Sequence, residues 1–476
     1  MLAILAVVLV EGLAWTVMVP ALQGADEGAH VSYVQEIADD GEIPWRFSDV
    51  GLLEREYPPS VSTEQWTAWL YAGLEPLRGN QAARPLWTPV DEAIWRAEAD
   101  KLGPKDKQNA IGSSAWRNPP LYYLAAAVPY KLAGGSFFDR VFGVRLLNVA
   151  LLVAIVALTW LLAGELFGRR RSLQAVAAGA VALHPVLLDV STRVTPDALL
   201  AALAASVLYL MALVVRRGPS ARLLALLAVA LVAAGLTQAR AIGLLAPAVF
   251  AVALAWWRHR QVGADGAGVP RPRRTGRDLL LWAGVLAAML VAVAFYATGF
   301  QPGELVGFWS YLWQFYLPAL PGMSTPIGPE WGAEQVYLDR FFATFVQFEV
   351  GLPGAWRDVI RAGVWVGLAL LVAAALRHRS ALRERRDLVA VLLAALALSV
   401  LALHAAAFRE LLENPTDPII TGRYLLMLVP LFGLGVAAAT TALPGRARAL
   451  GTGALLAGLV LLQLSAFGEV AARFYA

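Results

Sequence analysis

Long apolar stretches alternate with shorter polar ones along most of the chain. A helix that crosses a bilayer needs about 20 apolar residues, and eleven stretches suit such a helix: residues 2–20, 141–165, 173–189, 198–215, 223–237, 241–257, 279–298, 359–376, 388–408, 424–443 and 450–467. The pattern predicts an all-α polytopic membrane protein with about 11–12 transmembrane helices in one membrane domain, residues 1–476.

Two long polar regions, residues 21–118 and 299–358, interrupt this pattern. The first contains segments 62–75 and 89–101, which suit amphipathic helices on a membrane surface. We expect it to be a large external loop with juxtamembrane helices, and we expect the second to be an external loop region. Tryptophans of the first loop favour the membrane interface, although an indole also stacks on sugars: Trp45, Trp66, Trp69, Trp87, Trp95 and Trp116.

Basic residues indicate how the spans are oriented. Cytoplasmic loops are enriched in Lys and Arg, and arginines cluster here after Phe167, Val215, Trp257, Leu376 and Leu443. The alternate loops then face outside the cytoplasmic membrane: residues 21–118, 190–197, 237–241, 299–358 and 409–422. With the N-terminus inside, residues 119–134 cannot cross fully. We expect a partial, re-entrant or interfacial helix there, and an external C-terminus.

The composition agrees with a membrane protein. The chain has 476 residues, 58% hydrophobic and 16% charged, with a mean hydropathy of +0.59, whereas soluble domains are about 25% charged. Cysteine is absent, which excludes disulfides, thiolate metal sites and a cysteine nucleophile. The net charge of +4 is modest, and we expect no nucleic-acid partner.

Two carboxylates and an imidazole follow the first span directly. Asp26 and His30 are four residues apart and Glu27 and His30 are three apart, so on a helix either pair would share a face. The sequence leaves three roles open. One carboxylate could be a general base toward an acceptor hydroxyl, the three side chains could hold Mg, Mn or Zn, or the acids could cap a helix N-terminus.

Further polar side chains fall on the same external side of the predicted topology. Arginine binds phosphate through a planar fork and stays charged, so carboxylates beside arginines suit an anionic, phosphate-linked substrate. Charged residues also flank the spans of any membrane protein, and a structural role for each arginine is an equal alternative. The set comprises Arg117, Asn118, Arg193, Asp197, Gln238, Arg240, Gln314, Arg409, Glu413, Asp417 and Arg423.

The order of these motifs resembles the GT-C superfamily of polytopic glycosyltransferases, which use polyprenyl-phosphate-linked sugars and carry an acidic motif just after the first span. Three later segments resemble its members: NPPLYYLAAAVPY at 118–130, TRVTPDALLAALAA at 192–205 and TQARAIGLLAPA at 237–248. The closest likeness is to a bacterial family of membrane proteins of unknown function, through DE-x-x-H at 26–30, WQFYLP at 313–318 and GRYLLMLVP at 422–430.

The resemblance implies an inverting glycosyltransferase. Such an enzyme would move a sugar from a polyprenyl-phosphate-linked donor to a glycan, lipid or protein acceptor of the cell envelope. It would work at the outer face of the cytoplasmic membrane, in contact with membrane lipid. A divalent metal, Mg, Mn or Zn, is the one cofactor that it implies.

The same resemblance assigns roles to residues of this chain. The expected catalytic set, with Asp26 as the base, is also the expected metal-binding set: Asp26, Glu27 and His30. The set expected at the donor phosphate is Arg193, Arg240 and Arg423. The set expected to bind the rest of the substrates is Arg117, Asn118, Tyr122, Asp197, Trp313, Tyr316 and Tyr424.

Two other classes of function stay open. A transporter or flippase of lipid-linked glycan intermediates would use intramembrane groups for relay or gating, here Glu11, His184 and His404. A structural partner in envelope assembly would bind a donor without turnover. The sequence shows no internal repeat of the kind that many transporters carry.

Overall fold

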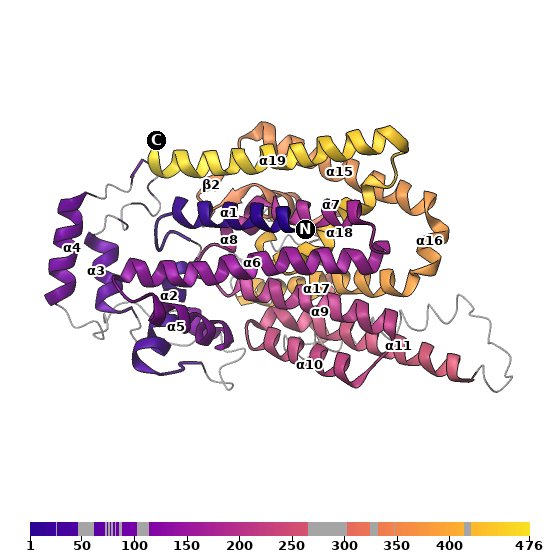
Figure 1. Cartoon of the computed structure of the whole chain (residues 1–476), viewed down its shortest axis with the longest axis horizontal. Helices are drawn as coiled ribbons and strands as arrows, with labels where there is room; N and C mark the ends of the chain where they lie inside the picture. The colour runs from indigo at the N-terminus through magenta and orange to yellow at the C-terminus, as the bar shows by residue number, and fades with distance from the viewer. Residues whose placement is uncertain are drawn as a thin grey trace.

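Long helices run side by side along one axis in the computed structural model (Figure 1). The structure describes residues 1–24, 26–45, 61–71, 74, 77, 80, 82–84, 88–101, 114–264, 302–323, 332–346, 348–413 and 420–476. The expected span 279–298, Trp87, Asp417 and the side chain of Glu413 lie outside the described residues.

Within the described residues, seven helical stretches are long and apolar enough to cross a membrane. They are α6 (Phe137–Phe167), α9 (Asp197–Arg217), η5 with α11 (Ala239–Leu244, Leu245–Ala264), α15 (Gly354–Arg377), α17 (Arg386–Glu413), η10 with α18 (Gly422–Leu428, Val429–Thr440) and α19 (Gly445–Tyr475). Two shorter apolar helices are α1 (Leu2–Met18) and α10 (Ala221–Gly235). The predicted all-α polytopic membrane fold is confirmed.

Helix α6 is the element around which the bundle packs. It contacts α1, α9, α5 (Leu121–Ala133) and α7 (Arg171–Ala182). A capping box begins it, because the Ser136 side chain accepts from the Asp139 backbone N–H while the Asp139 carboxylate accepts from the Ser136 N–H. Gly168 ends it in the left-handed conformation, with φ 69°. The sequence thus sets both ends of this long helix.

The expected span 173–189 is not one helix, and that prediction was wrong. The chain breaks between α7 and a short α8 (Pro185–Val190). Proline lacks an N–H and disfavours helix at the residue before it, yet it suits the first turn of a new helix. His184 completes the break, because its Nδ1 accepts from the backbone N–H of Leu187 at 3.2 Å.

Short helices of the first loop gather at one end of the bundle, together with α5 and the C-terminus (Figure 1). They are α2 (Glu27–Gln35), η1 (Glu36–Asp40), α3 (Thr63–Tyr71), α4 (Pro89–Lys101) and η4 (Ser114–Arg117). The helix expected over 89–101 is confirmed, and the one expected over 62–75 is confirmed for residues 63–71, with residues 72, 73 and 75 outside the described residues. Helix α5 has 13 residues, roughly 20 Å at 1.5 Å per residue, which is too short to cross and fits the expected partial helix.

Two tryptophans of this loop do not anchor it at a membrane interface. Trp95 is 4% exposed and Trp116 is 5% exposed, and both belong to the hydrophobic core that packs on α6. The apolar body of the indole therefore stabilises the loop against the bundle. For these two residues the interfacial prediction was wrong, whereas Trp45, Trp66 and Trp69 are half-buried.

The second polar region also contains short elements. These are η7 (Pro302–Glu304), α13 (Leu305–Tyr316), η9 (Glu334–Asp339), α14 (Arg340–Phe342) and an antiparallel pair of two-residue strands, β1 (Thr344–Phe345) and β2 (Val350–Gly351). Helix α14 and η9 pack against η10, so this region supports the loop that carries Arg423.

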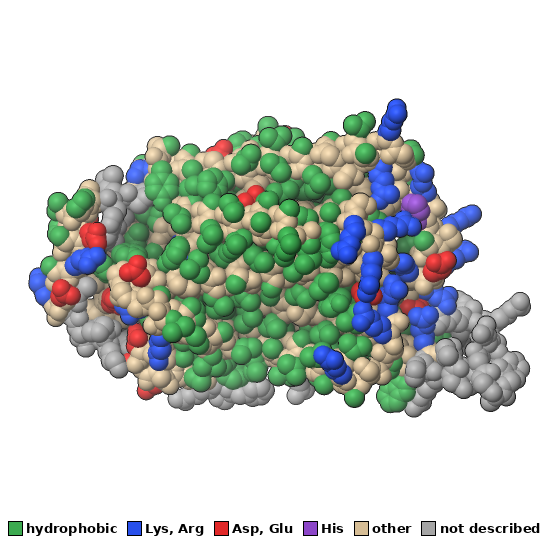
Figure 2. Space-filling view, viewed as in Figure 1, with side chains coloured by type: hydrophobic (Ala, Val, Ile, Leu, Met, Phe, Trp, Pro, Cys, Tyr) green, Lys and Arg blue, Asp and Glu red, His purple; other side chains and the backbone are tan. Residues whose placement is uncertain are grey.

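Charge is distributed unevenly along the bundle (Figure 2). Lys and Arg side chains gather at the end opposite the first-loop helices, beyond a broad apolar band. Helix α16 (Arg379–Glu384) lies at this basic end. The exposed arginines there include Arg169, Arg170, Arg171, Arg216, Arg217, Arg379, Arg383 and Arg446. This asymmetry is the one that the positive-inside rule associates with the cytoplasmic side.

The orientation can be measured by labelling single cysteines, since the chain has none of its own. Arg446 and Tyr475 lie at opposite ends of α19. We expect Tyr475→Cys to react with a membrane-impermeant maleimide on intact cells, and Arg446→Cys to react only after permeabilisation. The reverse pattern would contradict the positive-inside orientation.

Candidate active site

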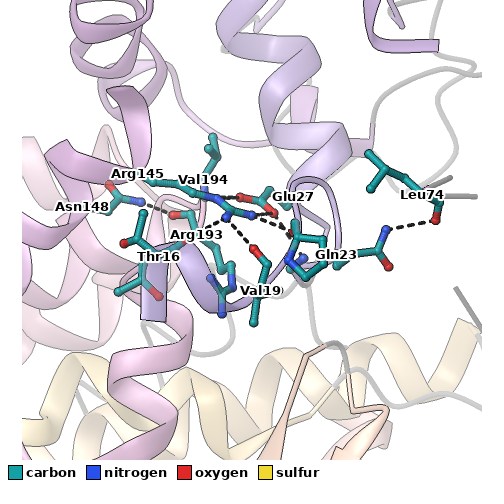
Figure 3. Close-up of polar contacts among 12 residues, drawn as sticks. Thr16, Val19, Gln23, Glu27, Leu74, Arg145, Asn148, Arg193 and Val194 are labelled. Carbon is teal, nitrogen blue, oxygen red and sulfur yellow. Dashed lines mark hydrogen bonds and ion pairs between the residues drawn. The ribbon is translucent and has the colours of Figure 1, made fainter. Parts of the chain in front are cut away.

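The last turn of α1 ends beside Arg145 of α6 (Figure 3). The Arg145 guanidinium donates to the backbone carbonyls of Thr16 (2.9 Å), Val19 (2.8 Å) and Pro20 (3.0 Å). A helix C-terminus leaves carbonyls without intrahelical partners, and a cation there is favourable. Arg145 therefore fixes the point where the chain leaves α1 and turns toward α2.

Glu27, the first residue of α2, is fully buried and has both oxygens occupied. Oε1 accepts from Arg145 Nε (2.8 Å) and the Val194 N–H (3.0 Å). Oε2 accepts from Arg145 Nη2 (2.7 Å) and the Gly24 N–H (3.2 Å). Burial raises the pKa of Glu27, but the charge and hydrogen bonds of Arg145 outweigh burial and lower the pKa below its usual value. Glu27 is a carboxylate that positions this segment.

Asp26 directly precedes Glu27 and has the opposite environment. Its backbone is left-handed (φ 57°, ψ 14°), a conformation that Asp adopts more readily than most residues. Its side chain is 54% exposed, and Oδ2 lies 3.7 Å from Arg423 Nη2. Of the two adjacent acids, Asp26 is the one with oxygens available to a substrate.

Asp197, the first residue of α9, joins two arginines. Its Oδ1 accepts from Gln238 Nε2 (3.1 Å) and from Arg240 Nη2, while Oδ2 lies 3.3 Å from Arg423 Nε. The Arg240 Cζ lies 3.9 Å from the centre of the Tyr424 ring, a cation–π contact. The structure thus brings together five residues predicted from sequence: Asp26, Asp197, Arg240, Arg423 and Tyr424.

Arg423 is less committed to protein partners than the other buried arginines of this region. Its contacts with Asp26 and Asp197 are ion pairs, and its Nε has no hydrogen-bond partner among the described atoms. Gly422 holds its loop tightly, because a Cβ there would lie 2.6 Å from the Val336 carbonyl oxygen. A fixed guanidinium whose Nη2 pairs only with an exposed carboxylate suits a phosphate oxygen.

His30 lies on α2 and is held by α5. Its Nδ1 lies 2.9 Å from the Tyr123 hydroxyl, and the Tyr123 ring stacks on Tyr33 with centroids 3.8 Å apart. Burial lowers the pKa of His30 to about 4, and the carboxylates of Asp26 and Asp197 raise it only in part. The imidazole is therefore neutral at pH 7.

Arg193 does not join the site, and its predicted contact with a donor phosphate does not fit the structure. Its side chain is 2% exposed and donates to Asp189 Oδ1 (2.9 Å) and the Trp15 carbonyl (3.0 Å). Gly24 packs on its aliphatic part, since a Cβ on Gly24 would lie 2.8 Å from Arg193 Cδ. Because phosphate binding would require breaking this buried pair, Arg193 stabilises the end of α1.

The remaining residues predicted to bind substrate lie in different environments. Asn118 donates its side-chain amide to the hydroxyl of Tyr123, the same group that contacts His30, at 3.2 Å. Tyr122 is fully buried and accepts from Asn148, so it contacts protein only. Arg117 is exposed at the end of η4.

Trp313 and Tyr316 belong to a separate cluster on α13. The Tyr316 hydroxyl lies 2.8 Å from His404 Nε2, and the Tyr311 hydroxyl lies 2.9 Å from His404 Nδ1. The Trp313 indole N–H donates to the Pro318 carbonyl. No described contact joins these residues to Asp26, so their predicted role in substrate binding stays a prediction.

The predicted metal-binding trio does not form a ligand set. Both oxygens of Glu27 already accept hydrogen bonds from Arg145 and backbone N–H groups. Among the described residues, no three His, Cys, Asp or Glu side chains converge in a way that could hold a metal ion. These residues therefore do not fit a metal ion.

Sequence reasoning missed Arg145 and Asn148. Both lie in the stretch 141–165, which was predicted as an uninterrupted apolar span. Asn148 Nδ2 donates to the Tyr122 hydroxyl (3.0 Å) and the Thr195 carbonyl (3.3 Å). Ionisable residues in membrane spans are rare and usually paired, and the i, i+3 spacing of Arg145 and Asn148 places them on one helix face. That signal could have identified them.

Residues 117–264 match the family model of dolichyl-phosphate-mannose-protein mannosyltransferases. The match covers less than half of the chain and agrees there with the predicted resemblance to GT-C glycosyltransferases. It includes Asn118, Asn148, Asp197 and Arg240. No curated protein matches the chain in sequence.

Solved structures of low identity also align with the chain. ArnT from Cupriavidus metallidurans bound to undecaprenyl phosphate is 14% identical, with a TM-score of 0.43, over 94% of this chain and 62% of that chain. The oligosaccharyltransferase AglB from Archaeoglobus fulgidus, in complex with an inhibitory peptide and a dolichol-phosphate, is 11% identical, with a TM-score of 0.49, over 98% and 56%.

A further Archaeoglobus fulgidus oligosaccharyltransferase structure, in complex with Zn and sulfate, is 13% identical, with a TM-score of 0.36, over 93% of this chain and 52% of that chain. This chain therefore spans less than two thirds of each of these proteins. TM-scores below 0.5 assign no function to it.

The contrast between Asp26 and Glu27 predicts that amide substitution lowers stability at Glu27 and leaves it almost unchanged at Asp26. Glu27→Gln leaves the buried Arg145 charge uncompensated, so we expect the free energy of unfolding to fall by about 3–5 kcal/mol. Asp26→Asn removes an exposed carboxylate that pairs at 3.7 Å, so we expect a change within about 0.5 kcal/mol. Denaturant unfolding of both variants in lipid nanodiscs measures the difference, and equal losses would contradict these roles.

Proposed function

We propose that the protein is an inverting glycosyltransferase that uses a polyprenyl-phosphate-linked sugar donor and transfers the sugar to a hydroxyl of a glycan, lipid or protein acceptor. The observation that supports this most strongly is the exposed Asp26 beside Arg423, which Asp197 and Arg240 hold in place. The family match over residues 117–264 supports the same class of donor, because its name specifies a dolichyl-phosphate sugar.

Asp26 is the general base in this proposal. Its carboxylate takes the proton of the acceptor hydroxyl, and the acceptor oxygen forms a bond to the anomeric carbon of the sugar. The bond between that carbon and the phosphate oxygen breaks, and the lipid phosphate leaves with the bonding electrons. One direct displacement of this kind inverts the anomeric configuration. General-base catalysis of such a step contributes about 10²–10⁴-fold.

Arg423 stabilises the leaving phosphate. Charge develops on the bridging oxygen as the bond breaks, and a preorganised cation near that oxygen lowers the barrier. Arg240 supports it from behind, through Asp197 and the Tyr424 ring. With two carboxylates and two guanidinium groups, the cluster is close to electroneutral before the donor binds. The negative phosphodiester of the donor then replaces the Asp26 carboxylate as the partner of Arg423.

We place this site at the outer face of the cytoplasmic membrane. Helix α2, which carries His30 and directly follows Asp26, lies at the end of the bundle opposite the arginine-rich end (Figures 1 and 2). The positive-inside rule assigns the arginine-rich end to the cytoplasm. Lipid-linked donors presented at the outer leaflet would meet Arg423 at the membrane boundary.

Asp26→Asn tests the proposed base. Asn keeps the size and tolerates the left-handed backbone, but it cannot take a proton, so we expect turnover to fall by about 10²–10⁴-fold while donor binding stays within a few-fold. The assay is release of undecaprenyl phosphate from a radiolabelled sugar donor by purified protein in proteoliposomes. Wild-type turnover in Asp26→Asn would rule out the assignment. Movement of intact donor lipid across the bilayer without release would instead favour a transporter.

Arg423→Gln tests the phosphate contact in the same assay. We expect loss of about 10²–10³-fold in turnover, since one donor to a developing anion is removed, together with weaker binding of undecaprenyl phosphate. The matched control is Arg446→Gln. Arg446 is an exposed arginine in the first turn of α19, far from the site, and its substitution should leave both measurements unchanged. Equal losses of turnover and binding in the two variants would contradict a specific phosphate contact at Arg423.

A further inference from the structure

One nitrogen of the His30 ring has a partner and the other has none. Nδ1 lies 2.9 Å from the Tyr123 hydroxyl, and no described residue forms a hydrogen bond with Nε2. The residue is 6% exposed. Its backbone N–H donates to the Asp26 carbonyl at 3.1 Å, and the charges that act on the ring are those of Asp26, Asp197, Arg423 and Glu27. A nearly buried ring therefore carries one unpartnered polar atom next to the cluster that we propose binds phosphate.

The partners of Tyr123 determine which ring nitrogen carries the proton. Asn118 donates its side-chain amide to the Tyr123 oxygen at 3.2 Å, so that oxygen already accepts a hydrogen bond. Tyr123 is 0% exposed, and its own proton needs an acceptor, because an unsatisfied buried donor costs free energy. His30 Nδ1 is the acceptor within reach. A neutral ring that accepts at Nδ1 carries its proton at Nε2.

We propose that His30 is a fixed hydrogen-bond donor to the lipid phosphate: the Asn118–Tyr123 relay holds its ring as the Nε2–H tautomer, and Nε2–H donates to a phosphate oxygen beside Arg423. This assignment rests on the proposed function for the identity of the ligand. It gives His30 a role distinct from the base and metal-ligand roles predicted from sequence, because a nitrogen that carries a proton can neither accept one nor bind a metal.

The surroundings make this donor rigid. The Tyr123 ring stacks on Tyr33 with an interplanar angle of 16°, and Tyr122 meets it edge-on at 5.3 Å between centroids. A neutral donor also adds no positive charge to a cluster in which two arginines already pair with two carboxylates. A hydrogen bond to a charged phosphate is stronger than one between neutral groups, so a neutral imidazole suffices there.

Nitrogen NMR on the full-length protein in lipid nanodiscs tests the tautomer directly. The chain has five histidines, and the signals of His30 are the ones absent from His30→Gln. With ¹⁵N-labelled histidine we expect a protonated Nε2 and an unprotonated Nδ1 at pH 7. Added undecaprenyl phosphate should shift the Nε2 signal, whereas undecaprenol, which lacks the phosphate, should not. An Nδ1–H tautomer, or an Nε2 signal indifferent to undecaprenyl phosphate, would overturn the inference.

A pair of substitutions separates the donor from a purely structural histidine. Gln carries an amide nitrogen near the position of Nε2, and Asn carries one near that of Nδ1. We expect His30→Gln to bind undecaprenyl phosphate within a few-fold of wild type, and His30→Asn to bind it about ten- to hundredfold more weakly, the loss of one charge-assisted hydrogen bond. Equal binding by the two variants would contradict the proposal.

Tyr123→Phe removes the hydroxyl that fixes the tautomer, and Tyr33→Phe is its control, because it keeps the stacked ring. We expect Tyr123→Phe to bring an Nδ1–H population into the His30 spectrum and to weaken binding of undecaprenyl phosphate about tenfold, and Tyr33→Phe to do neither. These measurements need no turnover. A protein that binds undecaprenyl phosphate through Nε2–H but transfers no sugar would contradict the proposed function and still support the role of His30.

Discussion

The buried pair of Glu27 and Arg145 is the interaction on which the geometry of the site depends. Arg145 is 4% exposed and Glu27 is fully buried, so neither charge has water to stabilise it, and each depends on the other and on backbone groups. Arg145 binds the carbonyls that end α1, and Glu27 binds the N–H groups of Gly24 and Val194. Removing either partner leaves an isolated buried charge, which proteins tolerate poorly. The pair thus ties the first helix, the acidic motif and the loop before α9 to α6.

Asp26 owes its exposure to this pair. Because Glu27 is pinned inward as the first residue of α2, the preceding residue takes a left-handed backbone and turns its carboxylate outward. Arg423 arrives from the opposite end of the sequence, and Gly422 allows its loop to approach the backbone of Val336 closely. Asp197 then forms ion pairs with both Arg423 and Arg240.

Much of the scaffold and part of the site could be predicted from sequence. Apolar runs of adequate length identify spans because lipid leaves the backbone few alternatives to helix. The position of Asp26 after the first span, and the basic loops that place Arg423 on the same side, were enough to predict their meeting. Pro185 was available as a signal for the break after α7, and Arg145 as a signal within an apolar run, but both were masked by high average hydropathy.

The different roles of residues with similar chemistry could not be predicted from the sequence. Asp26 and Glu27 have nearly the same chemistry, and what separates them is an arginine 118 residues away from Glu27 in the sequence. Arg193 and Arg423 likewise look alike in sequence, yet Arg193 pairs with the buried Asp189, whereas Arg423 pairs with the exposed Asp26. Trp95 and Trp116 are buried for the same reason: long-range packing, which no local pattern encodes, decides their environment.

The most direct measurement is a structure of the protein with a non-transferable donor analogue, a polyprenyl phosphonate bearing a sugar, bound in nanodiscs. The account predicts the phosphorus next to Arg423, with Arg240 behind it, and the anomeric carbon on the side of Asp26. A phosphonate bound elsewhere, for example among the arginines of the opposite end, with the Asp26 carboxylate out of reach of the sugar, would contradict it.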